Sequence, residues 1–227
     1  MFDDLYPFTK ELIMDTSFWH NIWQRGEIGF HRAAAHPALV QHWSALSRPG
    51  APVLVPLCGK TPDLHWLHQQ GHPVTGVELS AIAVEAFFQE WGLAPHKDKT
   101  HDGLDSFSGE NITLLQGDFF QLAPQQGFPL FYDRAALVAL DHPLRQRYLA
   151  HLAHCLAPGA EGILITFEFD AASMDGPPFP VFEKELHDQP FFAVRCLARN
   201  EVTDSHGGLV ARGAEKVVEA VYHLVKE

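Results

Sequence analysis

The stretch VLVPLCGKTPDLHWLHQQGHPVTGVELS (residues 53–80) decides the fold class, because it reads as strand, turn, helix and strand. Its first apolar run, VLVPL, predicts a buried strand, and Pro62 then opens a helix that Gly71 ends. The run PVTGVEL (73–79) predicts a second strand. A strand–helix–strand unit of this kind builds a parallel sheet that is covered by helices.

The remaining sequence continues this alternation of short apolar runs and helical patterns. We predict, in order, helix 81–92 with Ser80 as its N-cap, strands 111–118 and 128–134, helix 141–159, strand 161–170, helix 179–188, and a late antiparallel hairpin of 191–202 with 215–225. The polar segment 95–110 predicts an exposed loop. The pattern therefore predicts an α/β fold: a doubly wound, Rossmann-like domain with a mostly parallel seven-stranded sheet and helices on both faces.

Length and composition predict one soluble domain. The 227 residues, 46% hydrophobic and 19% charged, suffice for a single core, with residues 1–50 as an N-terminal helical segment and 51–227 as the α/β core. The acidic N-terminus lacks the pattern of a secretory signal, and three scattered cysteines predict reduced thiols in the cytoplasm. A net charge of −12 without a basic block argues against a nucleic-acid partner, and no apolar run is long enough for a membrane span. We expect a monomer.

The turn after the first strand indicates the class of cofactor. Gly59 is its only glycine, and Glu78 ends the second strand 19 residues later, where a carboxylate can accept hydrogen bonds from both hydroxyls of a ribose. The pyrophosphate of NAD or FAD needs a glycine-rich turn, which is missing here, so a cofactor without phosphate fits better, such as S-adenosylmethionine. The alternative is an ordinary strand–helix–strand unit whose glycine only makes the turn.

The ends of the next strands carry further candidate residues. Asp118, Phe119 and Phe120 suit an adenine site, with a carboxylate near the exocyclic amine and aromatic faces beside the ring. The alternative is that both phenylalanines belong to the core, which fits one of them at least as well. Asp133 and Arg134 lie where the amino-acid tail of the cofactor and the substrate would meet. A structural ion pair is the alternative interpretation of this dipeptide.

The N-terminal segment SFWHNIWQRGEIGFHR (17–32) is rich in aromatic residues. Trp19 and Trp23 are spaced i, i+4 and share one helix face, with Phe30 following. Such a stripe is more often core, but here it precedes the first strand, and it predicts a lid that would enclose a sulfonium and exclude water.

Two histidine-rich helical regions do not predict a metal site. His65, His68 and His72 share one region, and His151 and His154 share another with Cys155. Helical HxxH without a carboxylate and a third ligand is weak, so we expect partly exposed histidines and no metal.

Taken together, these segments resemble the thiopurine S-methyltransferase family, in particular its bacterial members with a short N-terminus. The resemblance is carried by FWHNIWQRGEIGFH, PLCGK followed by GHPVTGVELS, NITLLQGDFF, YDRAALVAL and GPPFPV, which are spread from residue 18 to 181. It implies a class I methyltransferase fold and an enzyme that uses S-adenosylmethionine and releases S-adenosylhomocysteine. The implied reaction is methylation of the sulfur of aromatic and heterocyclic thiols, in detoxification. For some bacterial relatives the resemblance also implies methylation of selenium and tellurium compounds. It places Trp19, Trp23 and Phe30 in the lid, Leu57 and Gly59 at the methionine portion, Glu78 on the ribose, Phe119 and Phe120 beside adenine, and Arg134 at the methionine carboxylate or the substrate.

The chain departs from this family where vertebrate members have a second arginine near the substrate. Here RCLARNEVTDSHGG offers Arg195, Arg199, Ser205 and His206 without a clean match, which leaves the substrate preference open. We expect a thiolate to attack the sulfonium methyl in line, without a dedicated general base, while Arg134 favours the thiolate and Asp133 orients Arg134. Three other functions are considered: a thiol or halide methyltransferase of the same fold, a cofactor-binding module without turnover, and an NAD dehydrogenase, which the missing glycines disfavour.

Overall fold

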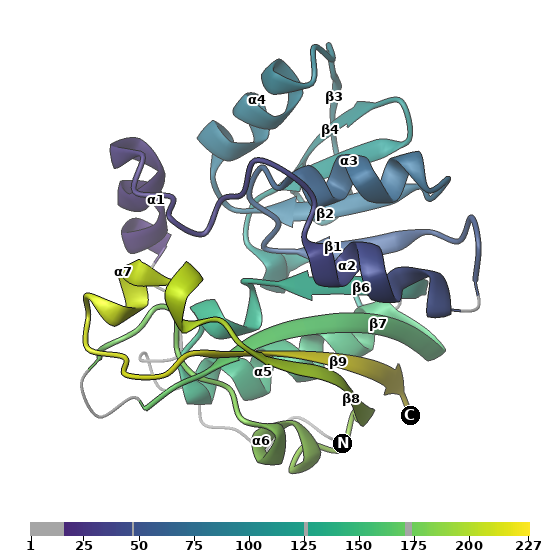
Figure 1. Cartoon of the computed structure of the whole chain (residues 1–227). Coiled ribbons are helices and arrows are strands. Elements are labelled where there is room, and N and C mark those ends of the chain that lie inside the picture. The colour runs from purple at the N-terminus through teal and green to yellow at the C-terminus, as the bar shows by residue number, and fades with distance from the viewer. Residues whose placement is uncertain (1–15, 47, 125–126, 171–173) are drawn as a thin grey trace, which may run out of the picture.

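The computed structural model describes residues 16–46, 48–124, 127–170 and 174–227. Within these ranges nine strands form one sheet in the order β3-β4-β5-β2-β1-β6-β7-β9-β8 (Figure 1). The strands are β1 (Val53–Pro56), β2 (Val74–Glu78), β3 (His96–Lys99), β4 (Asp105–Gly109), β5 (Ile112–Gln116), β6 (Phe128–Arg134), β7 (Leu156–Glu168), β8 (Phe192–Glu201) and β9 (Val218–Lys226). The helices are α1 (Thr16–Arg25), α2 (Pro37–His42), α3 (Pro62–Gln69), α4 (Ala81–Glu90), α5 (His142–Cys155), α6 (Glu183–His187) and α7 (Gly207–Val210).

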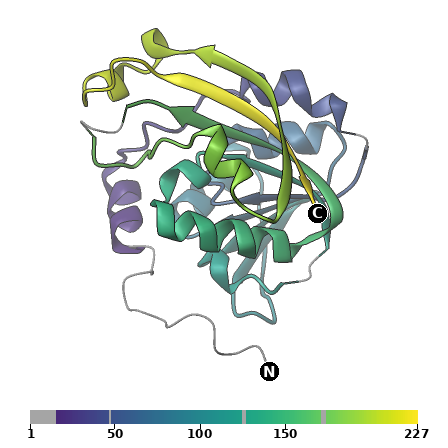
Figure 2. The same ribbon diagram turned by 90° about the horizontal axis from the view of Figure 1, so that it is seen from below.

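The centre of the sheet is parallel and is buried on both faces. Strands β5, β2, β1, β6 and β7 run parallel to one another. Along β1, Leu54 packs into a core that contains residues of α5, whereas Val53 and Val55 pack into a second core with residues of α2, α3 and α4. Figures 1 and 2 show these helices on opposite sides of the sheet. Helices on both faces are thus confirmed, and burial on both faces explains the uninterrupted apolar runs of the sequence.

The predicted number of strands is wrong, because the segment 95–110 is not a loop. It forms the hairpin of β3 and β4, and β4 pairs antiparallel with β5. All four residues of β3 (HKDK) are exposed, and every residue of β4 is only partly buried. A charged edge strand of this kind lacks the apolar alternation by which strands are recognised, and its lysines protect the edge from pairing with other chains.

Other boundaries also move by a few residues. β7 begins at Leu156, directly after α5, whereas the Pro–Gly pair in this region predicted a longer helix and a later strand. The predicted helix 179–188 is reduced to α6, Glu183–His187. Ser80 is the predicted N-cap of α4, and its Oγ accepts a hydrogen bond from the Ala83 N–H at 3.4 Å.

The late hairpin of β8 and β9 is confirmed. β9 pairs antiparallel with both β7 and β8, so that the C-terminal strand lies inside the sheet and β8 forms its edge. The connection between the two strands carries α7, which lies near α1 on the side where the parallel strands end (Figure 1). In the described part of the chain, no helix has the length and apolar character to span a membrane.

Candidate functional site

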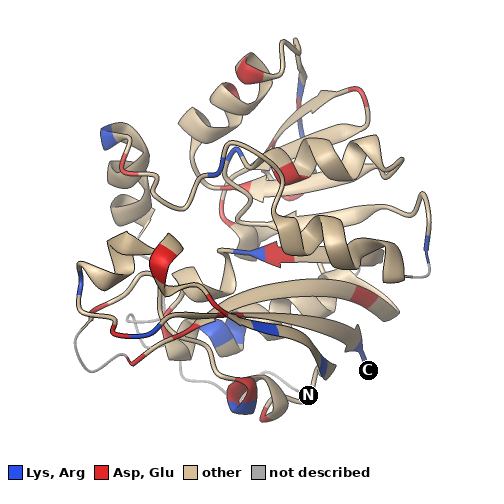
Figure 3. Cartoon of the chain, in the orientation of Figure 1, with Lys and Arg blue, Asp and Glu red and all other residues tan. Residues whose placement is uncertain are grey.

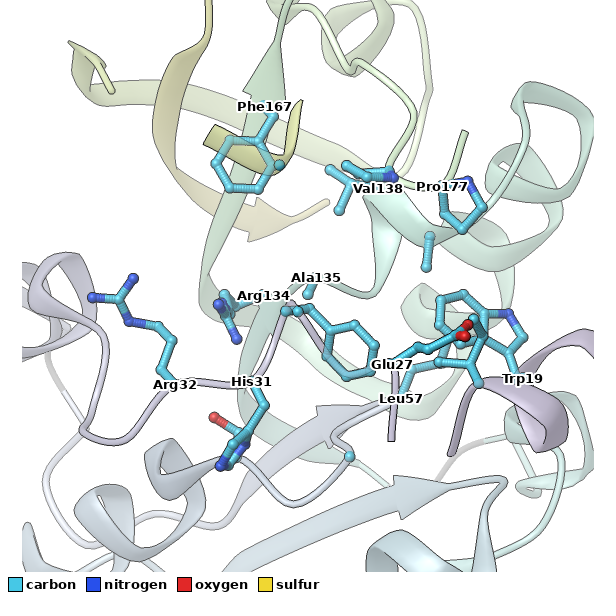
Figure 4. A pocket seen from close by; sticks show the side chains of 18 of the residues that line it. Trp19, Glu27, His31, Arg32, Leu57, Arg134, Ala135, Val138, Phe167 and Pro177 are labelled. Atoms are coloured by element: carbon cyan, nitrogen blue, oxygen red, sulfur yellow. The ribbon is translucent and has the colours of Figure 1, made fainter. Parts of the chain in front are cut away.

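A cavity of about 720 Å³ opens at the C-terminal ends of the parallel strands (Figure 4). Its lining comes from the segment 18–32, the turn after β1, the end of β2, the turn after β6, the loop around 176–178 and the segment 205–212. The size is within the range of cavities that bind small ligands, and the position is where doubly wound sheets bind them. Seven predicted residues line it together: Trp19, Trp23, Phe30, Leu57, Gly59, Glu78 and Arg134.

The turn after β1 has an unusual backbone that brings it close to α1. Leu57 has φ +48° and Gly59 has φ +56°, both in the left-handed region. A Cβ at Gly59 would lie 3.2 Å from Cζ2 of Trp23, which is closer than ordinary packing allows. Glycine at this position therefore serves the backbone conformation and the close approach of the indole at once.

Glu78 is held at the bottom of the cavity by backbone donors. Its Oε2 accepts a hydrogen bond from the Gly59 N–H at 2.7 Å, and its Oε1 accepts one from the Ser80 N–H at 2.7 Å. The side chain is buried, and burial raises the pKa of Glu78 to about 6, against the opposite effect of these backbone hydrogen bonds. The carboxylate ties the ends of β1 and β2 together and keeps lone pairs for a further donor.

The aromatic residues of the N-terminal segment form a cluster around Phe30. The Phe30 ring lies edge-on to Trp19 and to Trp23, with centroid distances of 6.1 Å and 5.8 Å. Trp23 is buried and Trp19 is partly buried. We call Trp19, Trp23 and Phe30 the aromatic cluster; it covers one side of the cavity.

The end of the N-terminal segment is anchored to the sheet through Asp63. The His36 N–H donates to Asp63 Oδ1 at 2.7 Å, and the Tyr132 hydroxyl donates to Asp63 Oδ2 at 3.0 Å. The His36 Nε2 lies 3.2 Å from Glu219 Oε2 on β9. These buried contacts attach the segment that carries the aromatic cluster to the strands beneath it.

Arg134 and Asp133 end β6 but face different surroundings. Arg134 lines the cavity, and the following Ala135 turns the chain with φ +64°. Asp133 is buried: its Oδ1 accepts from the Leu137 N–H at 3.2 Å and its Oδ2 from the Tyr148 hydroxyl at 2.7 Å. Burial raises the pKa of Asp133 to about 6. No described contact joins Asp133 to Arg134, so the structure does not support the predicted orienting role.

The predicted adenine residues do not line the cavity. Phe119 is buried in the core, with ring centroids 5.3 Å from Tyr148 and 5.0 Å from His151. Phe120 is partly buried, and the Arg147 guanidinium lies 4.0 Å from its ring centroid. Asp118 accepts from the Phe120 N–H at 3.0 Å and caps a short 3-10 turn. The burial of Phe119 agrees with the alternative interpretation of this residue as core.

Of the four ambiguous residues near the C-terminus, two line the cavity. Ser205 and His206 do so. Arg199 instead forms ion pairs with Glu168 and Glu183, and Arg195 is exposed on β8 outside the cavity lining.

Several cavity residues were missed by the sequence prediction. Arg212 donates hydrogen bonds to the Asp175 carbonyl at 2.9 Å and to the Pro177 carbonyl at 2.7 Å, and so connects the loop at 176–178 with α7. The motif GPPFPV marked that loop in the sequence, but no pattern connected it to Arg212. Arg32 follows the aromatic cluster directly and was overlooked because aromatic content alone defined that segment.

The histidines form no metal centre in the described residues, where no group of three or more His, Cys, Asp or Glu side chains could hold an ion. His72 is an exception to the expected partial exposure. It is buried, and its Nε2 accepts from the Trp43 indole N–H at 3.0 Å while its Nδ1 lies 2.8 Å from the Ala51 carbonyl.

Comparison with known proteins gives consistent results. Residues 14–227 match the family model described as thiopurine S-methyltransferase. Proteins with the same name from Nitrosomonas eutropha and Pseudomonas paraeruginosa are 41% and 44% identical to this chain over 93% of its length, covering 98% and 99% of their own. The structure of a Burkholderia thailandensis 1,6-didemethyltoxoflavin N1-methyltransferase with bound substrate and S-adenosylhomocysteine superposes with a TM-score of 0.62. At 20% identity, covering 93% of this chain and 86% of that one, it supports the class I methyltransferase fold alone. The match over nearly the whole chain and the two close relatives show that this chain belongs to the thiopurine S-methyltransferase family.

Proposed function

We propose that this chain transfers a methyl group from S-adenosylmethionine to the sulfur of thiopurines and other aromatic or heterocyclic thiols. The observation that carries the proposal is the meeting, in one cavity, of a buried Glu78, a single-glycine turn, the aromatic cluster and Arg134. The turn lacks the glycines that a pyrophosphate needs, and its carboxylate suits a ribose. Family membership supports the same reaction.

Residues of the turn and of the aromatic cluster would hold the cofactor. Glu78 would accept the ribose hydroxyls through lone pairs that Gly59 and Ser80 leave free, and Leu57 and Gly59 would lie along the methionine portion. Trp19, Trp23 and Phe30 would serve as a lid whose aromatic faces favour a positive charge and exclude water. When bound, S-adenosylmethionine supplies an electrophilic methyl group on a sulfonium.

Arg134 would stabilise the anionic form of the acceptor. Its guanidinium lines the cavity next to the turn after β6 and has no protein partner among the described residues. A fixed cation beside a thiol favours the thiolate, which is the nucleophilic form. Heterocyclic thiols ionise near neutral pH, so the cavity needs to align and desolvate the thiolate rather than remove its proton. Free cysteines at positions 58, 155 and 196 suit a reducing, cytoplasmic setting for this chemistry.

A panel of acceptors tests the proposal directly. Purified protein with radiolabelled cofactor is offered a thiopurine, thiophenol, thiocyanate, iodide, and selenium and tellurium compounds. We expect transfer to the two aromatic thiols with much higher kcat/KM than to thiocyanate or iodide. Preference for the inorganic anions would instead indicate a halide methyltransferase of the same fold, and thermal stabilisation by the cofactor without any transfer would indicate a binding module.

Arg134→Ala tests the assignment of the cation. We expect kcat/KM for the thiopurine to fall roughly tenfold to a hundredfold, since a charge-assisted contact to the acceptor is lost. Arg195→Ala removes an exposed arginine of β8 outside the cavity lining and serves as the control. Equal kcat/KM for wild type and Arg134→Ala, at matched Tm, would remove Arg134 from the mechanism.

A further inference from the structure

A second arginine, Arg32, lines the same cavity as Arg134 but comes from a distant part of the chain. Arg32 lies two residues after Phe30 of the aromatic cluster, whereas Arg134 ends β6. In the view of Figure 4, the side chains of Arg32, Arg134 and His31 lie to the left of Glu27 and Trp19. The fold thus brings two guanidinium groups from distant parts of the chain to the lining of one cavity.

Neither guanidinium is engaged in an ion pair by the part of the chain that the structure describes. In residues 16–46, 48–124, 127–170 and 174–227, neither Arg32 nor Arg134 has an ion pair or hydrogen bond, and the Nε of Arg32 is fully shielded from solvent without an acceptor. Arg32 does act electrostatically on Glu219, but that carboxylate already lies 3.2 Å from His36 Nε2. A shielded donor without an acceptor is unfavourable, so an anion at this part of the lining would be stabilised.

The other charged groups of the cavity do not compensate this pair. Glu78 is engaged by backbone N–H donors, and Glu27 lies to the right of both arginines in the view of Figure 4. Lys60 is paired with Glu90, and burial, together with the charges of Lys60 and Arg134, lowers the pKa of His31. Although the chain carries a net charge of −12 and Figure 3 shows both signs interspersed along it, this part of the lining is locally positive.

We infer that Arg32 is a specificity-determining residue that pairs with an anionic substituent on the acceptor, so that the favoured acceptors are aromatic thiols with a carboxylate on the ring. The inference rests on the proposed function and deepens it. One cation, Arg134, is matched by the thiolate itself. The second is matched only if the acceptor carries a second negative group, and a guanidinium binds a carboxylate through two parallel hydrogen bonds.

Two acceptors of nearly the same shape isolate this charge. 4-Mercaptobenzoate and 4-mercaptobenzamide differ in the carboxylate, while both carry an electron-withdrawing group opposite the thiol. We expect wild type to prefer the benzoate in kcat/KM, and Arg32→Gln to lose roughly tenfold to a hundredfold of that preference, with little change for the benzamide. Arg32→Lys should restore part of it, Arg195→Gln should leave it unchanged, and added salt should reduce it in wild type.

The outcomes separate this inference from the proposed function. Calorimetric Kd of the cofactor must stay unchanged in Arg32→Gln; a large rise would assign Arg32 to the cofactor carboxylate and overturn the inference. Equal losses for both acceptors, or a wild-type preference for the benzamide, would overturn it as well. If wild type methylates neither of these two thiols and also fails to methylate the thiopurine, the proposed function itself is contradicted.

Discussion

At the scale of single residues, Glu78 is the residue whose role changes most between sequence and structure. The sequence predicts that Glu78, at the end of a strand, binds the ribose of the cofactor. The structure adds that the same carboxylate accepts the N–H of Gly59 and of Ser80, so it also holds the turn after β1 in place. One buried carboxylate would thereby position the cofactor and the backbone that surrounds it.

The titration of Glu78 gives a testable pH dependence of cofactor binding. Burial raises the pKa of Glu78 to about 6, and hydrogen bonds from ribose hydroxyls favour the charged form. Cofactor Kd should therefore rise as pH falls from 7.5 to 5. Glu78→Gln should bind roughly tenfold to a hundredfold more weakly at pH 7.5 and lose most of this pH dependence. Glu85→Gln, an exposed glutamate of α4 outside the cavity lining, is the matched control; an unaltered calorimetric Kd in Glu78→Gln would refute the ribose assignment.

At the scale of elements, helix α1 and the turn after β1 form one unit. The indole of Trp23 occupies the space that a side chain at position 59 would need, and Phe30 packs edge-on against it. The turn therefore determines where α1 can rest. A helix of ten residues is marginal alone in water, so its position depends on such contacts.

Gly59→Ala tests this unit. The left-handed backbone at φ +56° costs roughly 1 to 2 kcal/mol for alanine. The new Cβ would also lie only 3.2 Å from Cζ2 of Trp23, so the indole ring would have to move. We expect a lower Tm and a weaker cofactor Kd. Gly71→Ala, also at positive φ (+90°) but with open space around its Cβ, controls for the backbone cost. If both variants bind the cofactor equally well, the contact with Trp23 has no part in binding.

At the scale of the whole molecule, the strand ends and the start of α3 bury acids that a core normally excludes. Glu78 ends β2, Asp133 lies near the end of β6 and Asp63 lies in the first turn of α3, and all three are buried. Asp63 joins the N-terminal segment to Tyr132, and Asp133 joins the turn after β6 to Tyr148 on α5. These acids give the cavity a rigid frame, and burial raises the pKa of Glu78 and of Asp133, which couples the stability of the fold to pH.

Asp133→Asn separates a structural from a catalytic role. The pKa of Asp133 is raised from 3.8 to about 6, so the folded protein binds the proton more tightly than the unfolded chain. Proton binding by Asp133 therefore stabilises the folded protein at low pH. This contribution to the free energy of unfolding falls by about 3 kcal/mol as the pH rises from 4 to above 6. Asn carries no such charge. The stability of Asp133→Asn relative to wild type should thus increase over this range in urea titrations.

Activity provides the second readout for the same variant. Because Asp133 does not line the cavity, Asp133→Asn should keep most of the kcat for a thiopurine. Asp98→Asn, on the exposed edge strand β3, is the control for a charge change alone. If the stability of wild type and of Asp133→Asn changes with pH in the same way, and the variant loses most of its kcat, Asp133 has a catalytic role.

The parts of the fold that the sequence predicted well are those with strong local signals. The apolar runs of the parallel strands and the N-cap Ser80 are local signals, and all seven predicted strands are present. The hairpin of β3 and β4 was missed because HKDK and DSFSG carry neither apolar alternation nor a buried face. Its strand character comes from pairing with β5, a contact between segments that no short window contains.

The sequence by itself determined the class of fold and the class of cofactor, because strand and helix periods and the glycines of one turn act over a few residues. It also marked seven residues that share the cavity. Only the tertiary structure decided which side chains meet there. In the tertiary structure, Phe119 and Asp133 are buried, and Arg199 forms an ion pair with Glu168. Arg32 lines the same cavity as Arg134. The physical reason is that neighbouring residues on a strand face opposite sides, whereas packing joins segments a hundred residues apart.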